Sequence, residues 1–132
     1  MKRSSFFRQF IPIAGLAFAN PVIALSKDHQ EVCIYEGSIA GAPYYDAEKI
    51  RNKILRGDPL TLKREPTNHV DEWAIEIYWK SYKIGYIAQI DNLVLANMMD
   101  EGIALRAELS WHYEQNFLRN AFQCAVYMKK EN

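Results

Sequence analysis

Three histidines, two cysteines and several acidic residues are the side chains in this 132-residue chain that could support acid–base, nucleophilic or metal chemistry. The histidines are His29, His69 and His112, and none of them stands at a metal-ligand spacing from Cys33 or Cys124. The sequence also has neither a glycine-rich phosphate loop nor a nucleophile elbow. We therefore predict no catalytic site, no metal site and no cofactor.

Acidic residues stand next to each other twice, as Asp71-Glu72 and Asp100-Glu101. Adjacent side chains point apart in regular structure, so neither pair is expected to work as a general acid and base. The histidines have ordinary surface positions, with His69 at the tip of a turn, His112 on the polar side of a strand and His29 near the chain start. These patterns favour a protein that is not an enzyme.

The polar stretch REPTNHVD, residues 64–71, is the clearest candidate for a functional loop. Pro66 ends the strand before it, and the side chains of Asn68 and Asp71 can accept hydrogen bonds from nearby backbone N–H groups. These residues predict an exposed connection between two strands. The connection is either a plain hairpin loop or a binding loop.

The surrounding patterns predict the elements that position this loop. Leu60 and Leu62 share one face of a strand, and Trp73, Ile75 and Ile77 begin a period-two pattern that continues through a hairpin. Strands are predicted at residues 31–41, 59–65, 73–88 (as the hairpin), 103–113 and 122–128.

Two short helices are predicted between these strands, at residues 47–57 and 91–102. The first has Asp46 as its N-cap and Gly57 as its stop, and its apolar stripe is Ile50, Ile54 and Leu55. The second is capped by Asp91 or Asn92 and ends at Gly102. Six strands and two helices in the order β, α, three β, α, two β predict a mainly β fold, a small partly closed barrel.

Residues 1–26 have the pattern of a secretory signal peptide. Lys2, Arg3 and Arg8 precede an uncharged apolar stretch, and the sequence ALS ending at Ser26 fits a cleavage site, with Ala19 as the alternative. We expect an exported periplasmic or extracellular domain of residues 27–132 with no membrane span after cleavage. A buried N-terminal helix in a cytoplasmic protein is the alternative.

Removal of residues 1–26 takes away three basic and no acidic residues, which leaves 13 Lys and Arg against 16 Asp and Glu, a net charge of −3. Nonspecific nucleic-acid binding depends on neutralising phosphates, so such a role needs a local basic patch. The basic residues of positions 49–64 either form that patch or cover the solvated face of a helix. Cys33 and Cys124 either form a disulfide in an oxidising compartment or remain core thiols.

The run from Gly57 to Gly102 resembles the HIRAN domain pattern. Its GDPLTLKREPTNHVDEWAIEI segment is similar to the family's G-x-x-L-x-L-x-R-E-x-x-N-x-x-D-x-x-A-I-x-V strand-loop-strand, and it is followed by KIGYI and a helix ending in glycine. Upstream, IAGAPYYD resembles the family's first loop. The resemblance implies a small OB-like or SH3-like six-stranded barrel, which agrees with the barrel predicted from the periodicity.

The resemblance also implies a binding function, because HIRAN domains attached to Swi/Snf-like helicases bind the 3′-hydroxyl end of single-stranded DNA. By position, Asp71 corresponds to the carboxylate that accepts the terminal hydroxyl, Asn68 to the loop amide and Tyr44 to an aromatic residue that stacks on a base. We expect further contacts from Tyr45, Arg64 and Tyr86.

The chain departs from this pattern at three places, one of which is His69 in place of a usual proline. Val70 stands where the DNA-end binders carry a second aromatic residue, and near Gln89 a family lysine is absent. The two predicted functions are therefore a non-enzymatic module that binds single-stranded nucleic-acid ends, and an exported adaptor whose barrel binds a protein or cell-envelope ligand in the same groove.

Overall fold

The computed structural model of the chain describes residues 30–112 and 122–131. The predicted signal peptide and His29 lie outside these residues. The barrel unit consists of residues 33–129. The remaining described residues, 30–32 and 130–131, belong to a separate unit, in which the Lys130 N–H donates to the Gln30 carbonyl at 2.8 Å.

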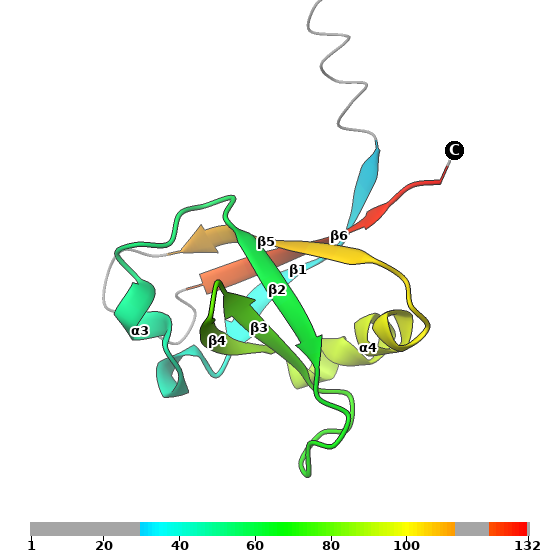
Figure 1. Ribbon diagram of the computed structural model, residues 1–132, viewed down its shortest axis with the longest axis horizontal. Helices are drawn as coiled ribbons and strands as arrows, with labels where there is room; N and C mark the ends of the chain where they lie inside the picture. Colours follow the sequence, from blue (N-terminus) through cyan, green and yellow to red (C-terminus); the bar gives the residue numbers. More distant parts are fainter. Residues whose placement is uncertain (1–29, 113–121, 132) are drawn as a thin grey trace, which may run out of the picture. The chain divides into compact units, whose positions relative to one another are not determined.

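The described residues form six strands with short helices between them (Figure 1). The strands are β1 (Glu31–Ala40), β2 (Pro59–Arg64), β3 (Ile75–Trp79), β4 (Tyr82–Ile87), β5 (Leu105–His112) and β6 (Phe122–Lys129). The helices are η1 (Ala42–Tyr44), α3 (Ala47–Ile50), η2 (Gln89–Asp91) and α4 (Asn92–Asp100). Neither α-helix of the described residues is long and apolar enough to cross a membrane.

The strands close into a barrel in the order β1-β4-β3-β2-β5-β6. The pairs β1–β4, β4–β3, β3–β2, β2–β5 and β5–β6 are antiparallel. The predicted order of strands and helices is confirmed, and the barrel is closed where a partly closed one was expected. β2 pairs with β3 from Thr61↔Tyr78 to Arg64↔Ile75, so both strands reach the connection predicted from residues 64–71.

The period-two positions predicted from the sequence fill the barrel core. Ile75, Ile77 and Trp79 of β3 and Phe122, Cys124 and Val126 of β6 are buried. Because every second side chain of a strand points to the same face, these residues pack on one another inside the barrel. Glu76, between Ile75 and Ile77, is also buried and pairs with Lys83 at 3.0 Å.

The helix predicted at residues 47–57 is shorter in the structure, where α3 ends at Ile50. Two contacts of the following turn explain this. The Asp58 carboxylate accepts a hydrogen bond from the Leu55 N–H at 2.9 Å, and the Gly57 N–H donates to the Leu109 carbonyl at 2.7 Å. These bonds lead the chain back to the barrel. Leu55, predicted as part of the apolar stripe, is consequently exposed.

The two cysteines are free thiols, so the predicted alternative of a disulfide is not formed. Cys124 is a core thiol without exposed surface, and burial raises its pKa to about 12. Cys33 is exposed. We therefore expect native protein to react with maleimide at Cys33 alone and unfolded protein to react at both thiols, as counted by intact mass. Labelling of both thiols in the native state would contradict the buried position of Cys124.

Candidate binding pocket at the β2–β3 loop

The side chain of Asn68 builds the β2–β3 loop, which we define as residues 65–74. Its Oδ1 accepts hydrogen bonds from the backbone N–H groups of Val70 (2.8 Å) and Asp71 (2.9 Å). Its Nδ2 donates to the carboxylate of Glu65. This is the local backbone bonding predicted for Asn68, and it occupies both ends of the amide.

Asp71 is held from two sides. Its Oδ1 accepts the Trp73 N–H at 3.0 Å, and its Oδ2 accepts Nδ2 of Asn92 at 2.7 Å. Asn92 is the first residue of α4 and is only 2% exposed. The carboxylate of Asp71 is therefore fixed both by its own loop and by the neighbouring helix.

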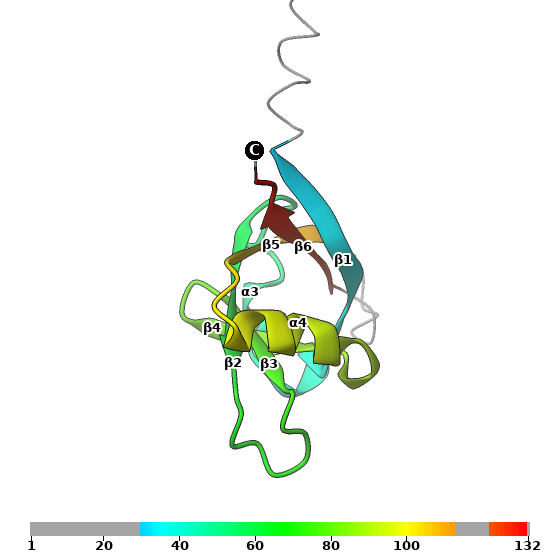
Figure 2. The same cartoon turned by 90° about the vertical axis from the view of Figure 1, so that its right-hand side faces the viewer.

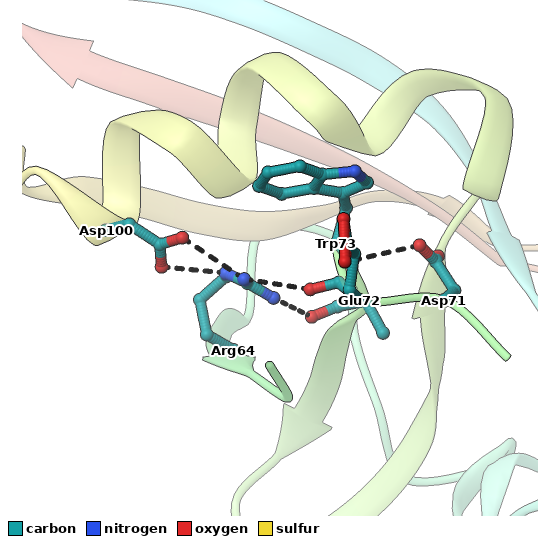
Figure 3. Close-up of polar contacts among 6 residues, drawn as sticks. Arg64, Asp71, Glu72, Trp73 and Asp100 are labelled. Carbon is teal, nitrogen blue, oxygen red and sulfur yellow. Dashed lines mark hydrogen bonds and ion pairs between the residues drawn. The ribbon is translucent and has the colours of Figure 1, made fainter. Parts of the chain in front are cut away.

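Arg64 ties the loop to the other end of α4 (Figure 3). Its Nε and Nη2 donate to the Asp100 carboxylate at 2.9 and 3.1 Å, Nη1 donates to the Ala74 carbonyl at 2.7 Å, and Nη2 also donates to the Glu72 carbonyl at 3.0 Å. Such paired contacts use the planar fork of the guanidinium group. Arg64, predicted as a nucleic-acid contact, is thus engaged in holding the loop.

A pocket of about 290 Å³ opens beside this loop. Among the six predicted site residues, Tyr45, Asn68, Asp71 and Tyr86 line it, whereas Tyr44 and Arg64 do not. Two of the three positions at which the chain departs from the family pattern, Val70 and Gln89, line the same pocket. The complete lining is Ala40, Tyr45, Asn68, Val70, Asp71, Ala74, Tyr86, Ile87 and Gln89.

Tyr45 and Tyr86 form the aromatic wall of the pocket. Their ring centroids lie 5.7 Å apart in an edge-to-face arrangement. Nζ of Lys83 lies 4.5 Å from the ring centroid of Tyr45 and 4.4 Å from that of Tyr86. The same ammonium group donates to the Tyr86 hydroxyl at 2.8 Å and pairs with Glu76 at 3.0 Å.

A hydrogen-bond chain connects this aromatic wall to the loop. The Tyr86 hydroxyl donates to the Glu65 carboxylate at 3.0 Å, the carboxylate that also accepts from Asn68. The hydrogen bond from Asn68 is the main reason that the pKa of Glu65 lies below its usual value, with smaller contributions from Tyr86 and the charge of Lys83. The loop and the wall are therefore one connected network.

The hydrogen bonds also shift the pKa values of the wall. Burial is the main cause that raises the pKa of Tyr86 to about 12, and its bond to Glu65 adds to the increase. Burial acts to lower the pKa of Lys83, but the hydrogen bonds to Tyr86 and Glu76 and the charge of Glu76 outweigh it, so the net shift is upward. Tyr86 is therefore neutral and Lys83 charged at physiological pH.

None of the lining residues in the described part of the chain is a lysine, arginine or histidine. Asp71 is the charged residue of the lining, and Val70 and Gln89 are exposed. Within residues 30–112 and 122–131, no three His, Cys, Asp or Glu side chains form a cluster that could hold a metal ion. The pocket is suited to a donor group and an aromatic or apolar ring, and its lining supplies no cationic side chain for a phosphate.

The other predicted candidates lie outside the pocket. Tyr44 is 85% exposed, and its role as a stacking residue stays a prediction. His69 is exposed at the loop, as predicted. A larger groove of about 540 Å³ lies between β2, β5 and the end of α4, and no predicted site residue lines it.

The sequence patterns gave no functional role to Asn92, Lys83 or Glu65. Asn92 was considered only as a helix cap, although α4 has Asp91 in the N-cap position. The sequence alone does not show that Asn92 is buried, because its burial depends on which face of α4 packs against the barrel. Lys83 and Glu65 are part of the HIRAN domain pattern, as the lysine of KIGYI and the glutamate that follows Arg64. This pattern is the sequence signal that could have indicated them.

The fold and the pocket together define a small six-stranded β-barrel domain with a candidate ligand site at its β2–β3 loop. The HIRAN domain family model matches residues 32–131, so the chain belongs to the HIRAN domain family. The resemblance that rested on residues 57–102 is thereby confirmed.

The solved structures that are similar to this chain include a bacterial protein and a human HIRAN domain. A protein from Lactobacillus plantarum aligns with a TM-score of 0.67 and 23% identity, covering 76% of this chain and 97% of that one. The HIRAN domain of human HLTF aligns with a TM-score of 0.56 and 18% identity, covering 77% and 83%. At these identities the likeness concerns the fold. No curated protein matches the sequence.

Proposed function

We propose that this protein is a non-enzymatic module that binds the 3′-hydroxyl end of single-stranded DNA in the pocket beside the β2–β3 loop. The observation that carries the proposal is the position of Asp71. Its carboxylate is fixed by Trp73 and Asn92 and lines the same pocket as the rings of Tyr45 and Tyr86. Family membership supports a nucleic-acid ligand over other hydroxyl donors.

The chemistry of these groups suits a terminal nucleoside. An ionised carboxylate accepts a hydrogen bond from a sugar hydroxyl and repels a phosphate at the same position. An aromatic face stacks on a base with about 1–3 kcal/mol and little sequence preference. Because the lining supplies no cation, the interaction depends on the terminal sugar and base more than on the phosphate backbone.

Fluorescence anisotropy with oligonucleotides that end in a 3′-hydroxyl or a 3′-phosphate tests the proposal. We expect wild-type protein to prefer the hydroxyl end by about tenfold or more, and Asp71→Asn to lose most of that preference because the repulsive charge is gone. Glu101→Gln, an exposed residue outside the pocket, is the matched control. Equal binding of both ends, or binding of neither, refutes end recognition.

A second candidate function is an exported adaptor that binds a protein or cell-envelope ligand in the same pocket. It is favoured by Val70 and Gln89, which place an aliphatic and an uncharged side chain in the lining, and by the signal pattern of residues 1–26. Fractionation of tagged full-length protein distinguishes the two. A cytoplasmic, uncleaved product removes the main support for the adaptor.

Val70→Tyr is expected to strengthen binding of single-stranded DNA about tenfold, because it adds a stacking ring at the mouth of the pocket. Val70 is 86% exposed, so the larger side chain needs no repacking and the melting temperature is expected to stay the same. Titration calorimetry measures the gain. Val94→Tyr, at a 66% exposed position of α4 outside the pocket, is the control. The same gain in both variants would contradict a specific effect.

A further inference from the structure

Helix α4 is connected to the β2–β3 loop at both of its ends, directly through Asn92 and indirectly through Arg64. Arg64 is the last residue of β2 and donates to the loop carbonyls of Glu72 and Ala74. At the N-terminal end, Asn92 donates to Asp71 at 2.7 Å, and at the C-terminal end Asp100 accepts from Arg64 at 2.9 Å. The indole of Trp73 lies beneath the helix between these contacts (Figure 3). Figure 2 shows α4 crossing in front of the strands from which this loop extends. The helix therefore holds the loop at two points.

Asn92 stands at a position where an apolar residue would be expected. It is 2% exposed, and the other buried residues of the helix are Leu95 and Ala96. A buried amide is costly unless it is hydrogen-bonded. Here its Nδ2 donates to Oδ2 of Asp71, the carboxylate of the candidate pocket. This hydrogen bond offsets the cost of burying the amide of Asn92.

We infer that Asn92 is a positioning residue for ligand recognition, which orients the Asp71 carboxylate without cancelling its charge. The inference rests on the proposed function. An ionised carboxylate has about four acceptor positions. Trp73 occupies one on Oδ1 and Asn92 one on Oδ2, so both oxygens are anchored and the other positions have fixed directions.

Asn92 is suited to hold Asp71 in place because its side-chain amide is neutral and adds no charge to the pocket. A lysine or arginine at this position would anchor Asp71 equally well, but its positive charge would offset the repulsion between Asp71 and a phosphate. An amide supplies the hydrogen bond alone. Asn92 therefore sets the selectivity of the pocket for a hydroxyl, beyond its effect on stability.

Two variants test this role. Asn92→Leu keeps a similar volume and removes the donor, and we expect its preference for the 3′-hydroxyl over the 3′-phosphate end to fall about tenfold. Asn92→Asp places a second carboxylate beside Asp71, so that the two groups share a proton when the pH is lowered. We expect Asn92→Asp to bind the 3′-hydroxyl end about tenfold more weakly than wild-type protein at pH 8, because the two carboxylates repel each other and displace Asp71, and to recover towards pH 5. Asn92→Leu is expected to show no such recovery.

Comparison of Asn92→Asp with Asn92→Leu shows which part of the pH dependence comes from the pair formed by Asp71 and the new carboxylate at position 92. The other titratable and charged groups of the surrounding elements are common to both proteins. They are Glu65, His69 and Glu72 of the loop, Tyr45, Tyr86 and Lys83 of the aromatic wall, Asp91 beside Asn92, and Arg64 and Asp100 at the other end of α4. A purely structural role of Asn92 would change the melting temperature without a pH-dependent affinity for the 3′-hydroxyl end. Asn97→Asp, an exposed position of the same helix, is the matched control. Asn92→Ala replaces the leucine variant if that protein does not fold.

A measurement without DNA separates this inference from the proposed function. Carboxyl carbon chemical shifts report the titration of Asp71, and in Asn92→Asp the shared proton must raise the pKa of the pair relative to the wild-type carboxylate. If wild-type protein binds neither oligonucleotide, the proposed function fails and this titration still decides whether Asn92 contacts Asp71. An unchanged titration, or a folded Asn92→Leu protein with wild-type selectivity, overturns the inference.

Discussion

Gly85→Ala is expected to lower the free energy of unfolding by about 3 kcal/mol or more. Gly85 has a φ of +150°, and a Cβ at this position would lie 2.4 Å from the Ala40 carbonyl oxygen and 2.6 Å from Cγ2 of Ile39. Both belong to β1, which pairs with β4 at Ile39↔Ile87 and Ala40↔Tyr86. The strand cannot move away without opening this part of the barrel.

Chemical denaturation of Gly85→Ala and Gly57→Ala separates the clash from the backbone strain. Gly57 also has a left-handed backbone, with a φ of +91°, but nothing lies within 4 Å of a Cβ built there. Its replacement is expected to cost about 1 kcal/mol. Equal destabilisation by the two substitutions would show that the contact with β1 contributes nothing.

Arg64→Met is expected to lower the free energy of unfolding by about 2–4 kcal/mol. Arg64 is 11% exposed in its side chain, and its loss removes the donors for the Ala74 and Glu72 carbonyls as well as the ion pair with Asp100. The carboxylate is 43% exposed, so solvent screens the ion pair and it contributes the smaller share. Most of the loss is expected to come from the loop carbonyls.

Asp100→Asn is the matched variant for Arg64→Met, because it removes the charge pair and leaves the carbonyl contacts in place. We expect it to cost about 1 kcal/mol or less in denaturant unfolding. If the two substitutions destabilise equally, the ion pair dominates and the role given to the carbonyl contacts is wrong.

The fold could be predicted because its local signals agree with one another. Apolar residues at every second position mark the strands, and Gly102, which has a φ of +84°, follows the end of α4 as expected. Gly57 has a φ of +91°, but it does not end α3, which already stops at Ile50. The length of α3 could not be predicted in this way. It depends on the bond from Gly57 to Leu109, which are far apart in the sequence.

The local bonding of the loop at the candidate site could be predicted from the sequence, whereas the contacts between this region and α4 could not. Asn68 bonds to residues two and three positions away, and such local bonding follows from the residue type. Asp71 and Asn92 are separated by 21 positions, and Arg64 and Asp100 by 36. Their pairing is created by the packing of α4 on the barrel, so the sequence pattern indicated Arg64 as a ligand contact where the structure gives it an internal role.

Asn68 shapes the β2–β3 loop, and other residues of the pocket are available to select the ligand. Both ends of the Asn68 amide serve the loop itself, whereas Val70 and Gln89 are exposed and line the pocket. Substitutions at these two positions can therefore change what the pocket accepts while the turn keeps its shape. Two positions at the rim of the pocket can thus determine its ligand independently of the fold of the loop.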